Sequence, residues 1–386
     1  MKTLNVGLVG YKFMGKAHSN AFARLGMFFD LDADVRRKVL CGRDAAGVEQ
    51  ARQKLGWEST ETDYRALVQR PDIDIVDVVT PSDFHKDIVM AAIANGKHVF
   101  CEKPLALNLA DAREMLSAAR SAGVRHQIGF NYRFAPAVLL AKQLIDEGKL
   151  GTIFHFRGLY LQDWIIDPMF PMVWRLNRDI CGSGSLGDLG AHVIDLAHFL
   201  VGSIKTVTGM SKTFVKQRPV VESMTGLSGT AAADAPMADV TVDDVTSFCC
   251  EFNNGAMGTF EATRFAQGNK NALSFEINGS KGAVRFFVER VNELQFYDAT
   301  APAGQQGFAV IQATEGGHPF GANWWPTGHV LGYEHTFVHE MVSFVQAITK
   351  GEDAVPGFEA GVAAAQVMDA VDLSIERRAW VDVAAL

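Results

Sequence analysis

The alternation of apolar and polar positions divides this chain into two parts. Up to about residue 130, short apolar runs alternate with segments whose apolar residues recur at helical spacing. Strands alternating with helices of this length predict right-handed crossovers and a doubly wound parallel sheet of the α/β class. The predicted strands lie at 4–10, 37–42, 73–81, 97–104 and 124–133, and the predicted helices at 18–29, 44–56, 83–96 and 109–123.

The pattern changes after Asn131. One more helix is expected at 135–151, and from Thr152 onward the turn signals NNGA and NGSKG join segments that read as antiparallel strands. Residues 218–239 are small and polar, without periodicity, so we expect a long loop inserted between strands. Helical spacing returns at about 333–378. We therefore predict a first domain at 1–130 and an α+β domain with a large, mostly antiparallel sheet at 131–386.

The loop Gly10–Gly15, between the first predicted strand and helix, is a near match to a phosphate-binding loop. In a Rossmann domain, Gly-x-Gly-x-x-Gly at this place cradles a dinucleotide pyrophosphate. Lys12 replaces the middle glycine, which removes the close backbone approach but brings an ammonium group near the phosphates. A nucleotide site and a simple strand–helix turn both fit the pattern. The residues that would contact a dinucleotide are Gly10, Lys12, Phe13, Met14 and Gly15.

The end of the second predicted strand is where a dinucleotide-binding domain reads the adenosine ribose. An aspartate there selects NAD, but this strand ends at Gly42 and Arg43. With no carboxylate to repel a 2′-phosphate and a guanidinium to bind it, NADP is mildly favoured and NAD is not excluded. Alternatively, Arg43 is an exposed residue at the start of a helix and Asp44 reaches the ribose.

Lys103 directly follows a predicted parallel strand and precedes Pro104. Ligands of open α/β sheets bind beyond the carboxyl ends of the strands, so the lysine is aimed at the cleft. There it can hydrogen-bond a substrate hydroxyl and stabilise negative charge that develops on its oxygen. The alternative is a solvated surface lysine.

Asp188 and His192 are four residues apart at the start of an apolar segment with helical spacing. On a helix the two side chains share one face, which suits a proton-transfer pair. His192 would take the proton of a substrate hydroxyl, and Asp188 would orient and tune the imidazole. A surface Asp–His pair is the simpler alternative. A metal site would need a third ligand, and because no convincing one is found we expect no metal.

The composition argues against a nucleic-acid-binding, a membrane-spanning and a disulfide-linked protein. The 386 residues are 48% hydrophobic and 21% charged, with a net charge of −8 and no basic block, which argues against nucleic acid as a partner. No apolar run approaches the ~20 residues that span a bilayer, and the N-terminus does not read as a signal peptide. The five cysteines are scattered, so we expect a reducing cytoplasm without disulfides.

Five motifs in this order resemble the glucose–fructose oxidoreductase/inositol dehydrogenase/MocA family over nearly the whole chain: GYKFMGKAHS, TPSDFH, CEKPL, FNYR and GSGSLGDLGAH. In that family the lysine of EKP and the Asp and His of DxGxH form the catalytic group, which implies Lys103, Asp188 and His192 here. The same match implies cofactor contacts by Thr80, Pro81, His85, Glu102, Lys103 and Asn131, with Arg133, Trp174 and Arg175 near the nicotinamide and the sugar.

The stretch YLQDW and the downstream VWR resemble the subgroup that oxidises sugars and glycosides, such as levoglucosan dehydrogenases and glycoside 3-dehydrogenases. An aromatic plate beside polar side chains suits a pyranose; alternatively, these aromatics belong to the core. The resulting substrate contacts are Tyr160, Gln162, Asp163, Trp164 and Arg175, with His335 as a further candidate.

The resemblance implies an NAD(P)-dependent dehydrogenase of a sugar, glycoside or cyclic polyol, with C3 of a pyranose as a candidate carbon. It also implies an open-faced sheet in the second domain and a homo-oligomer, dimer or tetramer, paired through it. Two alternatives stay open. Some relatives cleave glycosidic bonds through transient oxidation by a tightly held NAD, and others bind the cofactor as regulators without turnover.

Overall fold

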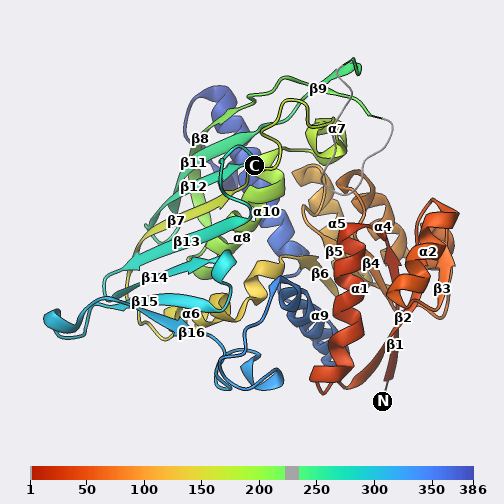
Figure 1. Cartoon of the computed structure of the whole chain (residues 1–386), viewed down its shortest axis with the longest axis horizontal. Coiled ribbons are helices and arrows are strands. Elements are labelled where there is room, and N and C mark those ends of the chain that lie inside the picture. The colour runs from red at the N-terminus through yellow and green to blue at the C-terminus, as the bar shows by residue number, and fades with distance from the viewer. Residues whose placement is uncertain (1, 222–233) are drawn as a thin grey trace. The chain divides into compact units, whose positions relative to one another are not determined.

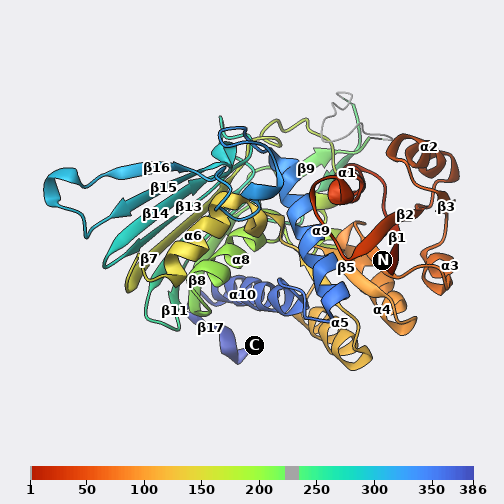
Figure 2. The same ribbon diagram turned by 90° about the horizontal axis from the view of Figure 1, so that it is seen from below.

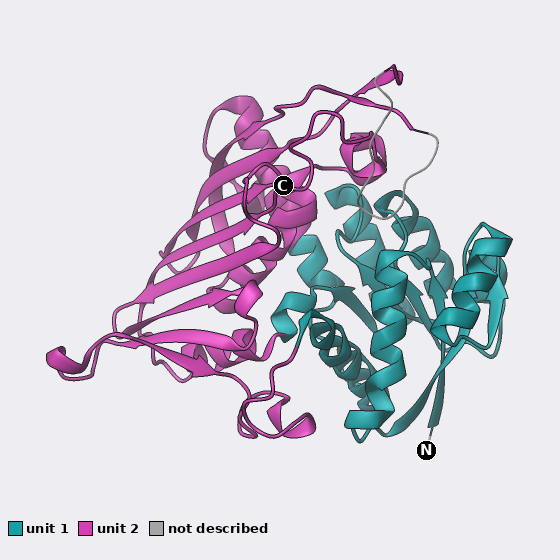
Figure 3. Cartoon of the chain, in the orientation of Figure 1, with its two compact units in different colours: residues 1–134, 332–363 teal, residues 135–331, 364–386 magenta. Residues whose placement is uncertain are grey.

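The computed structural model describes residues 2–221 and 234–386 and divides the chain into two compact units, residues 1–134 with 332–363 and residues 135–331 with 364–386 (Figure 3). Within the described residues, no helix is both long enough and apolar enough to cross a bilayer. Each unit has its own sheet (Figure 1).

The first unit contains a parallel six-stranded sheet in the order β3-β2-β1-β4-β5-β6, as the Rossmann prediction requires. Its central strands are buried on both faces, which explains why they read as continuous apolar runs. The elements are β1 Lys2–Val9, α1 Phe13–Phe28, β2 Ala33–Cys41, α2 Ala45–Leu55, β3 Ser59–Glu61, α3 Tyr64–Gln69, β4 Ile75–Val78, α4 His85–Ala94, β5 His98–Glu102, α5 Leu109–Ala122 and β6 His126–Gly129.

A helix from the far end of the chain completes this unit. Helix α9, Tyr333–Lys350, packs against α1, and Phe344 meets the ring of Phe100 on β5 at 5.7 Å. The predicted boundary at residue 130 put this helix in the second domain, whereas the structure groups residues 332–363 with the first unit. The long apolar stripe of α9 is buried against Rossmann elements that lie more than 200 residues earlier, and periodicity alone does not indicate which core a helix joins.

The second unit contains a nine-stranded sheet in the order β16-β15-β14-β13-β7-β12-β11-β8-β17, antiparallel except for the β7–β12 pair. The mostly antiparallel sheet is therefore confirmed. The elements are α6 Pro136–Asp146, β7 Ile153–Leu161, α7 Arg178–Cys181, α8 Ala191–Leu200, β8 Ile204–Lys212, β9 Gln217–Pro219, β10 Met237–Asp239, β11 Val245–Phe252, β12 Met257–Thr263, β13 Ala272–Gly279, β14 Gly282–Phe287, β15 Glu293–Asp298, β16 Phe308–Gln312 and β17 Val381–Asp382; α10, Phe358–Arg377, spans the boundary of the two ranges.

The two faces of the large sheet differ. One face buries a row of phenylalanines, among them Phe156, Phe260 and Phe275, on the side where α6, α8 and α10 lie (Figure 2). On the other face Met210 is 72% exposed and Met257 57% exposed. The alternation along each strand thus places one half of the residues in the core and leaves the other half more exposed in the described part of the chain.

Three local predictions differ from the structure. The segment 218–239, expected to be a loop, begins and ends in the antiparallel pair β9–β10; its residues 222–233 lie outside the described part of the chain. The strand expected at 124–133 ends at Gly129, because residues 131–134 form a 3₁₀ turn ahead of Pro136. The edge strand β16 was not predicted, since its burial does not alternate between buried and exposed.

Two glycines in α1 provide a test of the loop geometry. A Cβ on Gly15 would collide with the carbonyl oxygen of Gly10, whereas one on Gly26 would meet nothing within 4 Å. We expect Gly15→Ala to lower the free energy of unfolding by about 1–3 kcal/mol through backbone displacement. Gly26→Ala should raise it by about 0.5–1 kcal/mol through helix propensity. Urea unfolding measures both, and equal effects of the two variants would contradict the close approach of Gly15 to Gly10.

Candidate active site

The loop between β1 and α1 has the close packing of a phosphate-binding turn. Gly10 has φ +112°, and a Cβ there would lie 2.9 Å from the carbonyl oxygen of Val79, so only glycine fits. The backbone N–H of Gly10 donates to Cys41 at 3.0 Å, joining the loop to β2. Lys12 occupies the N-cap position of α1 and is exposed, and Phe13 is 58% exposed beside it. Lys12 and Phe13 are therefore accessible at the N-terminus of a helix, whereas Gly15 is buried.

Tyr11 covers the end of β2. Its ring occupies the space where a Cβ of Gly42 would be, and its hydroxyl donates to the Asp44 carboxylate at 3.5 Å. Burial, with the Asp44 charge next, raises the pKa of Tyr11. Asp44 occupies the N-cap position of α2 but makes no capping hydrogen bond. Arg43 is exposed, with its guanidinium 5.0 Å from the centre of the Phe84 ring.

His85 contacts both the loop that follows β4 and the loop that follows β5. Its Nδ1 lies 2.9 Å from the carbonyl oxygen of Pro104, and its Nε2 lies 3.0 Å from that of Thr80. Burial lowers the pKa of His85. Both ring nitrogens meet backbone oxygens, so the predicted cofactor contact by His85 stays a prediction. In contrast, the Thr80 hydroxyl is buried without a hydrogen-bond partner in the described structure, next to Pro81.

Lys103 leaves the end of β5 and is half-buried ahead of Pro104. Its backbone N–H donates to the Glu102 carboxylate at 3.2 Å, and Glu102 itself is buried. The position directly beyond the carboxyl end of a parallel strand is as predicted. The catalytic role of Lys103 and the cofactor contact of Glu102 stay predictions.

Three further predicted residues of the first unit are buried. The Asn131 amide donates to the Thr336 hydroxyl of α9 at 2.8 Å, and Arg133 lies on the same 3₁₀ turn. His335 accepts the backbone N–H of Gly332 at 3.0 Å and so binds the first turn of α9. Burial lowers the pKa of His335. The structure thus holds Asn131 and His335 by defined contacts within their own unit.

In the second unit, Asp188 is paired with a residue that sequence reasoning missed. Arg264, fully buried just after β12, donates to the Asp188 carboxylate at 2.9 Å and to the carbonyl oxygen of Gly184 at 3.2 Å. Asp188 lies in a π-helical turn, Leu186–Gly190, that leads into α8, and His192 is buried in the first turn of that helix. Arg264 directly follows the apolar strand β12, and this position of a charged residue could have indicated a role in the site.

A second missed residue, Asp243, shapes the glycine–serine run ahead of Asp188. Its buried carboxylate accepts the backbone N–H groups of Gly184 and Leu186 at 2.9 Å each, and also the hydroxyl of Ser185. A Cβ on Gly184 would collide with the Asp243 backbone, so glycine is required there. The turn that carries Asp188 is therefore organised by one buried carboxylate.

The predicted sugar contacts on and after β7 form a hydrogen-bonded row. Tyr160 and Gln162 both donate to the side-chain oxygen of Asn271, at 2.7 and 3.0 Å, and Gln162 accepts the indole N–H of Trp164 at 2.8 Å. The rings of Tyr160 and His192 are 6.0 Å apart. These residues thus gather near His192, while Trp164 also packs edge-on against core Phe170 at 5.2 Å.

The remaining candidates have other partners. Asp163 accepts from the Lys270 ammonium at 2.7 Å and from the backbone N–H of Gly268 at 2.9 Å. The guanidinium of Arg175 lies 4.3 Å from the Trp174 ring centre, and burial lowers the pKa of Arg175. These contacts fix Asp163 and Arg175 in defined orientations without deciding what they bind.

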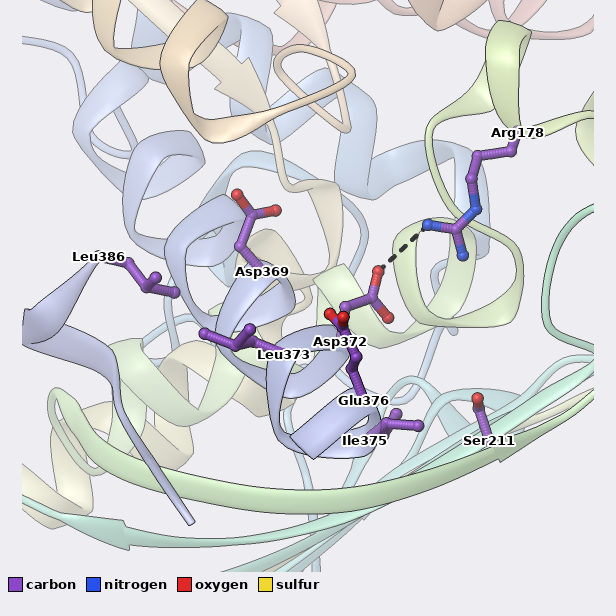
Figure 4. A pocket seen from close by; sticks show the side chains of 8 residues that line it. All are labelled: Arg178, Ser211, Asp369, Asp372, Leu373, Ile375, Glu376 and Leu386. Carbon is purple, nitrogen blue, oxygen red and sulfur yellow. Dashed lines mark hydrogen bonds and ion pairs between the residues drawn. The ribbon is translucent and has the colours of Figure 1, made fainter. Parts of the chain in front are cut away.

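A separate cavity of ≈520 Å³ in the second unit contains none of the predicted residues (Figure 4). Asp369, Asp372 and Glu376 of α10 line it, and Arg178 pairs with Asp372 at 3.4 Å. Burial raises the pKa of Asp372.

The parallel dinucleotide-type sheet, the tight glycine loop and the second, mostly antiparallel sheet are those of a two-domain oxidoreductase. Residues 4–130 match the profile of the oxidoreductase family with an NAD-binding Rossmann fold, and residues 138–285 match the GFO/IDH/MocA C-terminal domain. The chain belongs to the GFO/IDH/MocA family.

Similar proteins agree with this over the full length. A levoglucosan dehydrogenase of Pseudarthrobacter phenanthrenivorans is 41% identical over 99% of both chains, and an inositol 2-dehydrogenase of Rhizobium meliloti is 26% identical over 99% of this chain and 100% of that one. A solved levoglucosan dehydrogenase in complex with NADH and levoglucosan matches with a TM-score of 0.93 and 40% identity, covering 99% and 100% of the two chains. An oxidoreductase domain protein from Kribbella flavida matches with a TM-score of 0.94 and 49% identity over 99% and 100%.

The Arg264–Asp188 pair gives a prediction for stability. Arg264→Met leaves a partly buried carboxylate without its guanidinium, so we expect a loss of about 3 kcal/mol in the free energy of unfolding. Adding Asp188→Asn should recover part of this loss, because the unpaired charge is removed. Urea unfolding of both variants measures the effect.

A matched control is the pair Lys270–Asp163, whose ammonium end is 78% exposed. Lys270→Met should cost less than about 1 kcal/mol. Equal losses of unfolding free energy for Arg264→Met and Lys270→Met would contradict a larger contribution of the buried pair to stability.

Proposed function

We propose that this protein is a dehydrogenase that transfers a hydride between a nicotinamide cofactor and a secondary hydroxyl of a sugar, glycoside or cyclic polyol, with C3 of a pyranose as the candidate carbon. The observation that carries the proposal is that Asp188, in the turn leading into α8, and His192, in the first turn of α8, are four residues apart, with the Tyr160 ring 6.0 Å from the His192 ring. Full-length similarity to a levoglucosan dehydrogenase supports a sugar as the substrate.

The residues of the first unit fit a dinucleotide. At Gly10 and Gly15 a side chain would collide with the carbonyl oxygens of Val79 and Gly10, so the glycines allow a tight loop, and the buried Thr80 hydroxyl lacks a partner in the described residues. Exposed N–H groups at the start of α1 suit a pyrophosphate, and Lys12 would add a positive charge. When bound, a nicotinamide supplies the hydride acceptor or donor.

Each proposed catalytic residue has a separate role in the hydride transfer. His192 takes the proton of the substrate hydroxyl as the carbinol carbon gives up its hydride, and Asp188 orients the imidazole. The Lys103 ammonium stabilises the negative charge that develops on the oxygen. Arg264 holds the Asp188 carboxylate at 2.9 Å, which restricts the orientation of the pair.

We expect Lys103→Met to lower kcat by about 10²–10³-fold, the cost of removing one oxyanion donor. His192→Ala should lower kcat by roughly 10²–10⁴-fold through the loss of the general base. Absorbance of the reduced cofactor with levoglucosan and inositols as substrates measures turnover, and cofactor fluorescence should show unchanged binding. Lys142→Met, at an exposed helix pair, is the control. Full activity of both variants would refute the assignment.

We further propose that Arg43 is the residue through which NADP is accepted, beside NAD. Support comes from its exposed position after β2, where Asp44 is partnered by Tyr11. Arg43→Ala should raise KM for NADP by about tenfold, a loss of one charge-assisted contact, and leave KM for NAD little changed. Steady-state kinetics with both cofactors decide this. An equal change in both KM values would contradict a role in reading the 2′-phosphate.

The protein is proposed to be a cytoplasmic homo-oligomer, a dimer or tetramer. Support for the oligomer is the exposed sheet face, on which Met210 of β8, Met257 of β12, Phe287 of β14 and Val310 of β16 are exposed apolar side chains. Support for the compartment is that all five cysteines are free thiols, four of them buried. Sedimentation velocity measures the state of assembly.

A further inference from the structure

A cluster of buried ionisable groups lies inside the first unit, beneath the turn that carries Lys103. Its centre is His18 of α1, which is 0% exposed. The His18 Nδ1 is 2.8 Å from the Asp77 carboxylate of β4, and its Nε2 is 3.0 Å from the Glu102 carboxylate of β5. Asp77 is 0% and Glu102 5% exposed. The mechanism above uses none of these three groups.

The geometry determines the protonation of His18. A carboxylate only accepts hydrogen bonds, whereas a neutral imidazole has a single N–H. When Asp77 and Glu102 are both ionised, both ring nitrogens of His18 must donate, which only an imidazolium does; burial raises the pKa of Asp77. Burial alone would lower the pKa of His18, but the charges and hydrogen bonds of Asp77 and Glu102 raise it well above its usual value. His18 thus bonds one carboxyl group through each of its two ring nitrogens.

Glu340 of α9 brings a third carboxyl group to the cluster. It is 0% exposed, and neither carboxyl oxygen has a hydrogen-bond partner in the described residues. Burial, with the nearby charge of Glu102 next, raises the pKa of Glu340 well above its usual value. Burial therefore favours the neutral form of Glu340, and the hydrogen-bonded part of the cluster consists of His18, Asp77 and Glu102.

The Glu102 carboxylate is confined from several sides. One oxygen faces His18, and the other accepts the backbone N–H of Lys103 at 3.2 Å. Gly129 lies opposite it on β6, and a Cβ there would be 2.8 Å from the carboxylate oxygen. The position of Glu102 is thus set by His18 on α1, and Glu102 in turn binds the first peptide group of the Lys103 turn.

We propose that His18 is a positioning residue for Lys103: it holds the Glu102 carboxylate, which fixes the backbone from which the catalytic lysine extends. This rests on the proposed role of Lys103. It also gives Glu102 a role different from the predicted cofactor contact. A helix that begins at the phosphate-binding loop is thereby connected to the lysine through one chain of hydrogen bonds.

A divalent cation is the rival occupant, because donor atoms of His18, Glu102 and Glu340 lie within 4.8 Å of one another. The hydrogen bond from His18 Nε2 to Glu102 favours a proton at that place. The three groups are also too deeply buried for ready exchange of an ion, with exposures of 0, 5 and 0%.

The test is a double-mutant cycle on kcat with NAD and levoglucosan. His18→Gln should lower kcat by roughly 10²-fold through misplacement of Lys103, with KM for NAD little changed. If His18 acts through Lys103, adding His18→Gln to Lys103→Met should cause little further loss. Multiplication of the two losses in the double variant would overturn the proposal. Glu102→Gln, which removes a buried charge, should lower kcat to a similar extent. If His18→Gln does not fold, the cycle of Glu102→Gln with Lys103→Met tests the proposal instead.

A second readout needs no turnover. In protein labelled with ¹⁵N-lysine, the amide signal absent from Lys103→Met identifies Lys103. That signal should shift in His18→Gln and Glu102→Gln but not in His98→Gln, which alters a half-buried histidine at the other end of β5. An unmoved signal would overturn the proposal. If the wild-type protein oxidises no sugar, the proposed function fails, while the amide shift still tests the positioning role.

Glu340→Gln separates the proton network from a metal site. Because the amide is close in shape to a protonated carboxyl, kcat should stay unchanged. Elemental analysis of the purified protein should find less than one equivalent of zinc or manganese. One tightly held equivalent, lost together with activity in Glu340→Gln, would overturn the proposal.

Discussion

Buried charges have to be paired, and in this protein three such pairings hold turns that carry residues of the predicted site. Asp243 accepts the N–H groups of the glycine–serine turn, and Arg264 holds the Asp188 carboxylate at the end of that turn. In the other unit, Glu102 binds the backbone of Lys103. Leaving any one of these charges without its partner would cost several kcal/mol, so the turns are held far more firmly than exposed loops.

This constraint separates the polar residues into those proposed to touch the substrate and those that hold the surrounding backbone and side chains in place. Lys103 directly follows Glu102 in the chain, and His192 lies four residues after Asp188. Glu102 accepts from the Lys103 backbone at 3.2 Å, and Asp188 accepts from the Arg264 guanidinium at 2.9 Å. A hydride transfer needs reacting atoms placed to a fraction of an ångström, and rigid buried partners supply that placement.

Local patterns predicted most of the fold and part of the site. Strands β1 and β5 were predicted from their apolar runs. The loop between the first strand and helix was predicted from the spacing of its glycines. Arg264 and Asp243 were missed because their partners are about 60–80 residues away, and a spacing rule does not detect such contacts. The same reason explains α9, whose apolar stripe fits either core until Phe344 is seen against Phe100.

The central claim is that sugar oxidation ends in net hydride transfer rather than bond cleavage. The most direct measurement uses levoglucosan carrying deuterium on its ring carbinol carbons, incubated with the protein and NAD. Mass spectrometry should find reduced cofactor with one deuterium on the nicotinamide ring, in an amount equal to the ketone product. Cleaved or unchanged sugar without deuterated cofactor would contradict the account.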